Sequence, residues 1–153
     1  MKRESHHSAG VIVFREDSPR SYLLVRSALT RRPVWEFPKG ALEKGETERE
    51  AAERELLEET GLAPGDYSVV DGFQEEERYY FTSGAGHDLC LIRKRVDYFL
   101  AEWRKGAVRI SREASRFEWV TAEAALRMLR FPEKRRVLTA AEEWLAQREA
   151  RLG

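Results

Sequence analysis

The stretch that decides the fold spans residues 40–62 and reads GALEKGETEREAAERELLEETGL. It is rich in glutamate and carries residues that typically begin and end a helix. Thr47 followed three residues later by Glu50 is a capping box, in which each side chain can bond the free backbone N–H of the other. Glycine commonly closes a helix because it adopts left-handed backbone angles without strain. We therefore expect a helix from Thr47 to Thr60, closed by Gly61.

Three glutamates of this helix, Glu55, Glu58 and Glu59, are spaced three and four residues apart, so their carboxylates share one face. Like charges at that spacing repel by a few tenths of a kcal/mol per pair. A divalent cation would relieve the repulsion, and Mg²⁺ in particular links carboxylates to substrate phosphates. The alternative is an ordinary solvated acidic face, which needs no ion.

The spacing of specified residues favours the cation. The stretch matches the signature G-x5-E-x7-R-E-U-x-E-E-x-G-U, in which U is aliphatic, without a departure. In this pattern it resembles the Nudix hydrolases. The matching residues are Gly40, Glu46, Arg54, Glu55, Leu56, Glu58, Glu59, Gly61 and Leu62.

Length and charge set the broader limits. With 153 residues, 42% of them hydrophobic, the chain suits one domain over residues 1–153. Its formal net charge of zero gives no global basic field for nucleic acid or membrane surfaces. The single cysteine, Cys90, cannot form an intramolecular disulfide, and no apolar run approaches the roughly 20 residues that span a bilayer. We expect a cytoplasmic protein.

Short apolar and β-branched runs predict strands, whereas two later segments have helical spacing. The residues between 27 and 40, with two prolines, predict an irregular loop. The Nudix resemblance implies an α/β fold, an α/β/α sandwich around a mixed β-sheet. The predicted strands are Ala9–Phe14, Tyr22–Arg26, Tyr67–Phe73, Arg78–Thr82, Leu89–Trp103 and Arg116–Val120, and the later helices are Thr121–Leu129 and Pro132–Ala150.

The resemblance also assigns roles within the acidic stretch. It implies that Glu55, Glu58 and Glu59 bind the metal, together with the backbone near Gly40, and that Arg54 orients a glutamate. Mg²⁺ is the expected cofactor, with Mn²⁺ as an alternative. Which glutamate acts as the base, and how many ions bind, stay open.

Many members of the family have a further metal-binding carboxylate outside the signature. Here Glu113 is the first candidate for that ligand, and the alternatives are Glu118 and the acidic run Glu75–Glu77. The acidic run reads more simply as a solvated strand edge. Glu46 is expected to brace its loop through hydrogen bonds rather than to touch the metal.

Substrate preference depends on residues outside the helix. The segment VWEFPKG before the signature resembles the subfamily that hydrolyses diadenosine tetraphosphate and related dinucleoside polyphosphates, and the segments 93–103, 111–113 and 131–138 extend that resemblance. It implies that Lys39 contacts a polyphosphate chain. Weaker candidates for the same role are Arg31, Arg32 and Lys94.

A nucleobase needs a flat partner to stack on. Tyr79, Tyr80 and Phe131 lie where this subfamily places its stacking residues. Because neighbouring strand residues point to opposite faces, only one of the two tyrosines can line the pocket. We slightly favour Tyr80. The four tryptophans are expected to pack in the core.

The leading hypothesis is a Mg²⁺-dependent hydrolase that splits diadenosine tetraphosphate to ATP and AMP by attack of water on phosphorus. The same chemistry on a nucleoside triphosphate, an RNA 5′ end or an inositol pyrophosphate is the main alternative. A nucleotide-binding module without catalysis is a weaker one, since every expected metal carboxylate is present. The expected partner is a small nucleotide, with no membrane, and the protein is a monomer or a homodimer.

Overall fold

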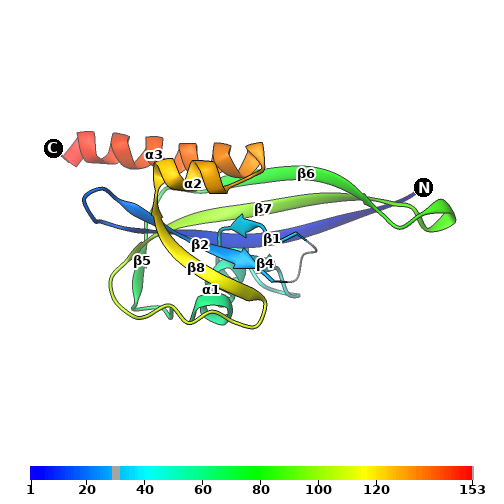
Figure 1. Ribbon diagram of the computed structural model, residues 1–153, viewed down its shortest axis with the longest axis horizontal. Helices are drawn as coiled ribbons and strands as arrows, with labels where there is room; N and C mark the ends of the chain where they lie inside the picture. Colours follow the sequence, from blue (N-terminus) through cyan, green and yellow to red (C-terminus); the bar gives the residue numbers. More distant parts are fainter. Residues whose placement is uncertain (29–31, 153) are drawn as a thin grey trace.

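The computed structural model describes residues 1–28 and 32–152, and in these residues a mixed sheet is covered by helices on both faces (Figure 1). The helices are α1 (Glu48–Thr60), α2 (Ala122–Met128) and α3 (Pro132–Leu152), with a short 3₁₀ turn at Gly86–Asp88. The strands are β1 (Lys2–Arg15), β2 (Ser21–Ser27), β3 (Trp35–Glu36), β4 (Lys39–Ala41), β5 (Tyr67–Val69), β6 (Glu75–Ser83), β7 (Cys90–Trp103) and β8 (Ala114–Thr121).

The two longest strands, β1 and β7, lie side by side and parallel at the centre of the sheet, paired from Lys2 opposite Cys90 to Phe14 opposite Glu102. The main strand order is β3-β2-β1-β7-β5. Strand β4 also pairs with β1, β6 with β7 and β8 with β2, all antiparallel. The sheet is therefore mixed, as predicted.

Alternation along β1 divides the apolar residues into two cores. Val11 and Val13 pack in the core that contains the buried face of α1. Ile12 and Phe14 point the other way, into the core that contains residues of α2 and α3 such as Leu138. Figure 1 shows the same three layers, with α1 below the sheet and α2 and α3 above it. The predicted α/β/α sandwich is confirmed.

The helix that carries the signature forms as its caps predict. The Thr47 hydroxyl accepts a hydrogen bond from the N–H of Glu50, and the Glu50 carboxylate accepts one from the N–H of Thr47, each 3.1 Å long. Gly61 ends the helix with a φ of 77°, a left-handed angle that favours glycine.

None of the described helices is long and apolar enough to cross a membrane.

Three differences from the predicted strands are larger than the others. Strand β1 begins at Lys2 instead of Ala9, because β7 supplies backbone partners to residues whose side chains are polar. Strand β5 ends at Val69, well before the predicted Phe73, and a turn with Gly72 at a φ of 95° follows it. The expected irregular loop contains β3 and the first two residues of β4, and these strands, of two and three residues, are too short to show a period.

Candidate active site

The acidic face of α1 lines a cavity of about 240 Å³. The structure brings together in it the four glutamates that the sequence predicted as metal ligands. Two residues that the sequence did not single out, Ser111 and Arg112, complete the wall, and the lining residues are Glu55, Glu58, Glu59, Ser111, Arg112 and Glu113.

Glu113 reaches this cavity because the chain before it follows the C-terminal end of α1. The last carbonyls of a helix lack partners within the helix. Here the N–H of Arg109 bonds the carbonyl of Thr60 at 2.7 Å, and the N–H of Ser111 bonds the carbonyl of Glu59 at 3.1 Å. The Ser111 hydroxyl then accepts a hydrogen bond from the N–H of Glu113 at 3.3 Å. These contacts explain why a residue more than 50 positions from the helix joins its acidic face.

The alternatives to Glu113 lie elsewhere. Glu118, on β8, pairs with Arg116 at 3.0 Å. Glu75 and Glu76 engage arginine side chains at the surface of β6, and Glu77 is buried in the opposite core region. Glu118 and the acidic run do not line the cavity.

Arg54 holds the acidic face to the loop that precedes the helix. Its Nη1 donates to Glu55 at 2.9 Å and to Glu58 at 3.2 Å. Its Nε donates to Glu46 at 2.6 Å, and its Nη2 donates to the carbonyl of Ala41 at 2.9 Å. The hydrogen bond from Arg54 lowers the pKa of Glu46. Arg54 thus orients two glutamates of the face, and Glu46 braces the loop.

Gly40 is set against the carboxyl group of Glu55. A Cβ atom at position 40 would lie 2.0 Å from Cδ of Glu55, a separation that no side chain tolerates. The absence of a side chain therefore lets this carboxylate approach the backbone of β4. The backbone of Gly40 adjoins the acidic face as a result.

Burial makes the charges of this face costly. Burial raises the pKa of Glu59 to about 8, and the negative charges of Glu36 and Glu55 act in the same direction. Burial likewise raises the pKa of Glu55. The N–H of Lys39 donates to Glu59 at 3.0 Å and partly offsets the effect. A divalent cation would neutralise carboxylates whose ionisation is unfavourable without a counterion. All of these ligands are oxygen donors, which ions such as Mg²⁺ prefer.

The charge of the Lys39 side chain acts on Glu59 of this face. The Nζ of Lys39 is 3.8 Å from Glu36. Lys94 lies on β7 opposite Tyr79 on β6, and its pKa is lowered by burial and then by the charge of Lys39. Of the weaker candidates, Arg32 is exposed, and Arg31 lies outside the described residues.

The three candidate aromatic residues separate into two groups. The Lys134 ammonium is 5.6 Å from the ring centre of Tyr79 and 5.7 Å from that of Phe131, so both rings flank it. Tyr80 points to the other face of β6, where it is 60% exposed and the Arg93 guanidinium lies 5.8 Å from its ring centre. The structure brings Tyr79, and not the favoured Tyr80, together with Phe131.

Beneath these rings lies a charged cluster that the sequence interpretation missed. The Lys134 ammonium donates to buried Glu77 at 3.1 Å, and the hydroxyl of Tyr98 also donates to Glu77 at 3.1 Å. The reading of residues 75–77 as a solvated edge is wrong for Glu77, because alternation along β6 turns this side chain toward α3. A buried charge of this kind needs a partner, and no local pattern reveals a lysine 57 residues away.

Comparison with known proteins identifies the class. The NUDIX domain family matches residues 4–141, so the chain belongs to the Nudix family and is a Nudix hydrolase. Two curated relatives are the pig (Sus scrofa) and mouse (Mus musculus) proteins named bis(5′-nucleosyl)-tetraphosphatase [asymmetrical]. Each is 28% identical over 151 residues, which cover 94% of this chain and 97% of the relative.

Solved structures support the fold. A C. elegans Ap4A hydrolase in a binary complex superposes with a TM-score of 0.79 at 24% identity, covering 93% of this chain and 98% of that one. The E. coli dihydroneopterin triphosphate pyrophosphohydrolase gives a TM-score of 0.67 at 18% identity, covering 86% and 91%. At these identities the likeness establishes the Nudix fold alone.

Proposed function

We propose that this Nudix hydrolase cleaves dinucleoside polyphosphates such as diadenosine tetraphosphate, giving ATP and AMP, and that Mg²⁺ bound at the acidic face is required. The names of the pig and mouse relatives, which align over nearly the whole chain, support this substrate class. Because the same acidic face serves many pyrophosphate substrates, the choice of substrate must come from the residues around it.

The observation that carries the proposal is a cluster of three lysines that reaches the acidic face through Lys39. The pKa of Lys94 is lowered by burial and by the charges of Lys39 and Lys134, so the three ammonium groups lie near one another, with Glu36 and Glu77 among them. Glu59 of the acidic face also acts on Lys39, but away from that face three ammonium groups stand against two carboxylates, which leaves a net positive charge there. A polyphosphate chain complements that charge, and ammonium groups bind phosphate oxygens as compact point charges.

Lys39 joins the two regions. Its backbone N–H binds Glu59 of the acidic face, and its side chain lies among Glu36, Tyr79 and Glu77. A substrate phosphate next to Lys39 is therefore also next to the metal-binding carboxylates. We assign Lys39 and Lys94 to phosphate contacts on this basis.

The aromatic pair provides the nucleoside end of the pocket. Tyr79 and Phe131 flank one ammonium group, and Phe131 is 51% exposed, so its ring is accessible to a base. Stacking of a base on an aromatic ring contributes about 1–3 kcal/mol. We therefore assign base stacking to Tyr79 and Phe131 and leave Tyr80 outside the pocket.

The acidic face supplies the groups for catalysis. Glu55, Glu58 and Glu59, with the backbone of Gly40 and the carboxylate of Glu113, would hold Mg²⁺. The bound ion would neutralise phosphoryl oxygens and acidify a coordinated water. The water oxygen forms a bond to phosphorus, the bridging P–O bond to the leaving nucleotide breaks, and a carboxylate of the face accepts the proton of the water.

The direct test incubates the purified protein with Mg²⁺ and a panel of substrates, followed by chromatography of the products. The panel contains diadenosine tetraphosphate, a nucleoside triphosphate, a 5′-triphosphorylated RNA and an inositol pyrophosphate. We expect ATP and AMP in equal amounts from the first, with ¹⁸O from labelled water in a phosphate group of one product. Efficient hydrolysis of another substrate, with no mononucleotide from the first, would overturn the assignment.

Two controls connect the activity to the acidic face. Removal of divalent ions with EDTA should abolish turnover, and Mg²⁺ or Mn²⁺ should restore it. Glu58→Gln keeps the shape of the side chain and removes its charge, and since Glu58 is largely exposed the fold should be unaffected. We expect kcat to fall by orders of magnitude, while unchanged turnover would contradict the metal role.

A further inference from the structure

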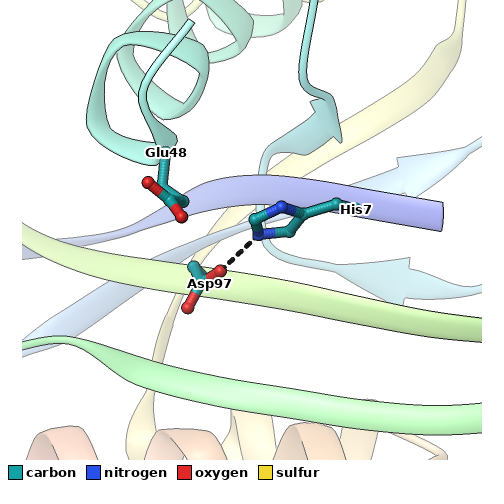
Figure 2. A group of neighbouring side chains, drawn as sticks. All are labelled: His7, Glu48 and Asp97. Carbon is teal, nitrogen blue, oxygen red and sulfur yellow. Dashed lines mark hydrogen bonds and ion pairs between the residues drawn. The ribbon is translucent and has the colours of Figure 1, made fainter. Parts of the chain in front are cut away.

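A second group of potential metal ligands lies at the other end of α1. His7 of β1, Glu48 in the first turn of α1 and Asp97 of β7 each offer one ligand atom, and these atoms lie within 4.8 Å of one another (Figure 2). Glu48 precedes Glu55 by seven residues, about 10 Å along a helix. None of the three lines the acidic cavity. We propose that His7, Glu48 and Asp97 form a second metal site, which binds a transition ion such as Zn²⁺.

Alternation along the central strands brings two of these ligands together. His7 and Asp97 lie on the sheet face that carries Val11 and Ala101, which is the face that α1 covers. Their side chains meet with Nε2 of His7 at 2.5 Å from Oδ2 of Asp97. Figure 2 shows Glu48 descending toward this pair from the start of the helix. Three elements distant in sequence therefore converge on one point.

Asp97 is positioned as a ligand by its own partners. The residue is 2% exposed, and its Oδ1 accepts hydrogen bonds from Gln74 at 3.4 Å and from Arg95 at 3.3 Å. The Nε of Arg95 also lies 3.1 Å from Oδ2 of Asp97 and 3.2 Å from Oε2 of Glu76. These contacts to both oxygens fix the orientation of the carboxylate, as is usual for carboxylates that bind metals.

Among the described residues, the Glu48 carboxylate has no polar partner that explains its position. Among the residues that the structure describes, its half-buried carboxylate makes neither a hydrogen bond nor an ion pair. The positive end of the helix dipole favours a negative residue at this position. It does not explain why the side chain points toward a second carboxylate. A cation held between Glu48 and Asp97 accounts for that direction.

The donor set indicates the kind of ion. One imidazole nitrogen and two carboxylate oxygens suit Zn²⁺, whereas Mg²⁺ prefers oxygen donors alone. Bonds of about 2.0 Å in a tetrahedron place ligand atoms about 3.3 Å apart. Binding therefore moves His7 and Asp97 apart by less than about 1 Å, which the partly exposed His7 ring can accommodate. The ion would tie β1 and β7 to the first turn of the helix that carries the acidic face.

The test is calorimetric titration of the full chain with Zn²⁺ in excess Mg²⁺, so that Mg²⁺ competes for the acidic face. We expect one Zn²⁺ per chain and a shift of the His7 ring resonances in the NMR spectrum. His7→Ala should abolish this binding, and Glu48→Gln should weaken it at least tenfold. His6→Ala is the matched control, because His6 is adjacent, exposed and bonded to Glu4 instead. It should bind Zn²⁺ like the wild type.

Two results would overturn the site. One is that the wild type binds no Zn²⁺ under these conditions, and the other is that His7→Ala binds it with unchanged affinity and stoichiometry. Either would leave the His7–Asp97 contact as a simple hydrogen bond. Circular dichroism checks that each variant is folded, and among the described residues Glu48 has no hydrogen bond or ion pair for Glu48→Gln to lose. Hydrolysis of dinucleoside polyphosphates is assayed separately with Mg²⁺, so its outcome does not bear on the Zn²⁺ site.

Discussion

The backbone N–H of Lys39 donates a hydrogen bond of 3.0 Å to the buried carboxylate of Glu59. This bond fixes the distance between the lysine cluster and the acidic face, and it is one of few interactions that favour a charge on Glu59. Burial dominates, so the pKa of Glu59 is about 8 against an ordinary value of 4.5. The stability of the metal-free protein should therefore depend on pH.

For a group whose pKa is raised by folding, the stabilisation is complete below the unfolded value and is lost as pH rises through the folded value. The free energy of unfolding in EDTA should therefore fall by up to a few kcal/mol between about pH 5 and pH 8. Glu59→Gln, which cannot ionise, should flatten this slope, as urea unfolding at several pH values would measure. Glu58→Gln is the control, since Glu58 is largely exposed, and should keep the slope. A flat profile for the wild type would refute the prediction.

Gly40→Ala should impair catalysis without unfolding the protein. The new methyl group would overlap the carboxyl group of Glu55, at 2.0 Å, and force that side chain from its place beside Arg54. We expect kcat to fall at least tenfold, measured with diadenosine tetraphosphate and Mg²⁺.

Gly45→Ala separates steric overlap from backbone strain. Gly45 has a φ of 85° and nothing within 4 Å of its would-be Cβ, so alanine there costs about 1 kcal/mol of stability and touches nothing. Its kcat should stay near the wild-type value. If both variants lost activity equally, the contact with Glu55 would not be the cause.

Helix α1 was predictable because its signals are local. The capping box, Gly61 and the spacing of the glutamates all lie within residues 47–61, and the helix begins and ends as they indicate. The position of Glu113 was also suggested, although the backbone bonds that bring it to the helix end depend on tertiary structure.

The residues assigned to substrate binding were less predictable, because they contact residues that are distant in the sequence. Alternation shows that Tyr79 and Tyr80 face opposite ways, but it cannot say which face α3 covers. That choice depends on Lys134, which pairs with Glu77 across 57 residues. The burial of Glu77 could not be predicted for the same reason, because its neighbours in the sequence are those of a charged surface strand.

Phe131→Ala should weaken substrate binding, because it removes one of the two rings assigned to the base. A loss of 1–3 kcal/mol corresponds to an increase in KM of about 5- to 150-fold, with a smaller effect on kcat. Tyr80→Ala removes a comparably exposed ring from the other face and should leave KM unchanged. Steady-state kinetics on diadenosine tetraphosphate measures both. A larger KM effect from Tyr80→Ala would return the pocket to that residue.

The Lys134–Glu77 pair provides the last prediction, because both residues are almost fully buried and neither charge can reach water. Lys134→Met removes the ammonium and leaves the Glu77 carboxylate with the hydrogen bond from the Tyr98 hydroxyl. Breaking such a pair costs about 3–5 kcal/mol, since the remaining charge stays desolvated. Urea unfolding should show this loss for Lys134→Met. The double variant Glu77→Gln/Lys134→Met removes both charges and should recover much of the stability. If its loss in free energy of unfolding equalled the sum of the losses in the two single variants, the two side chains would act independently.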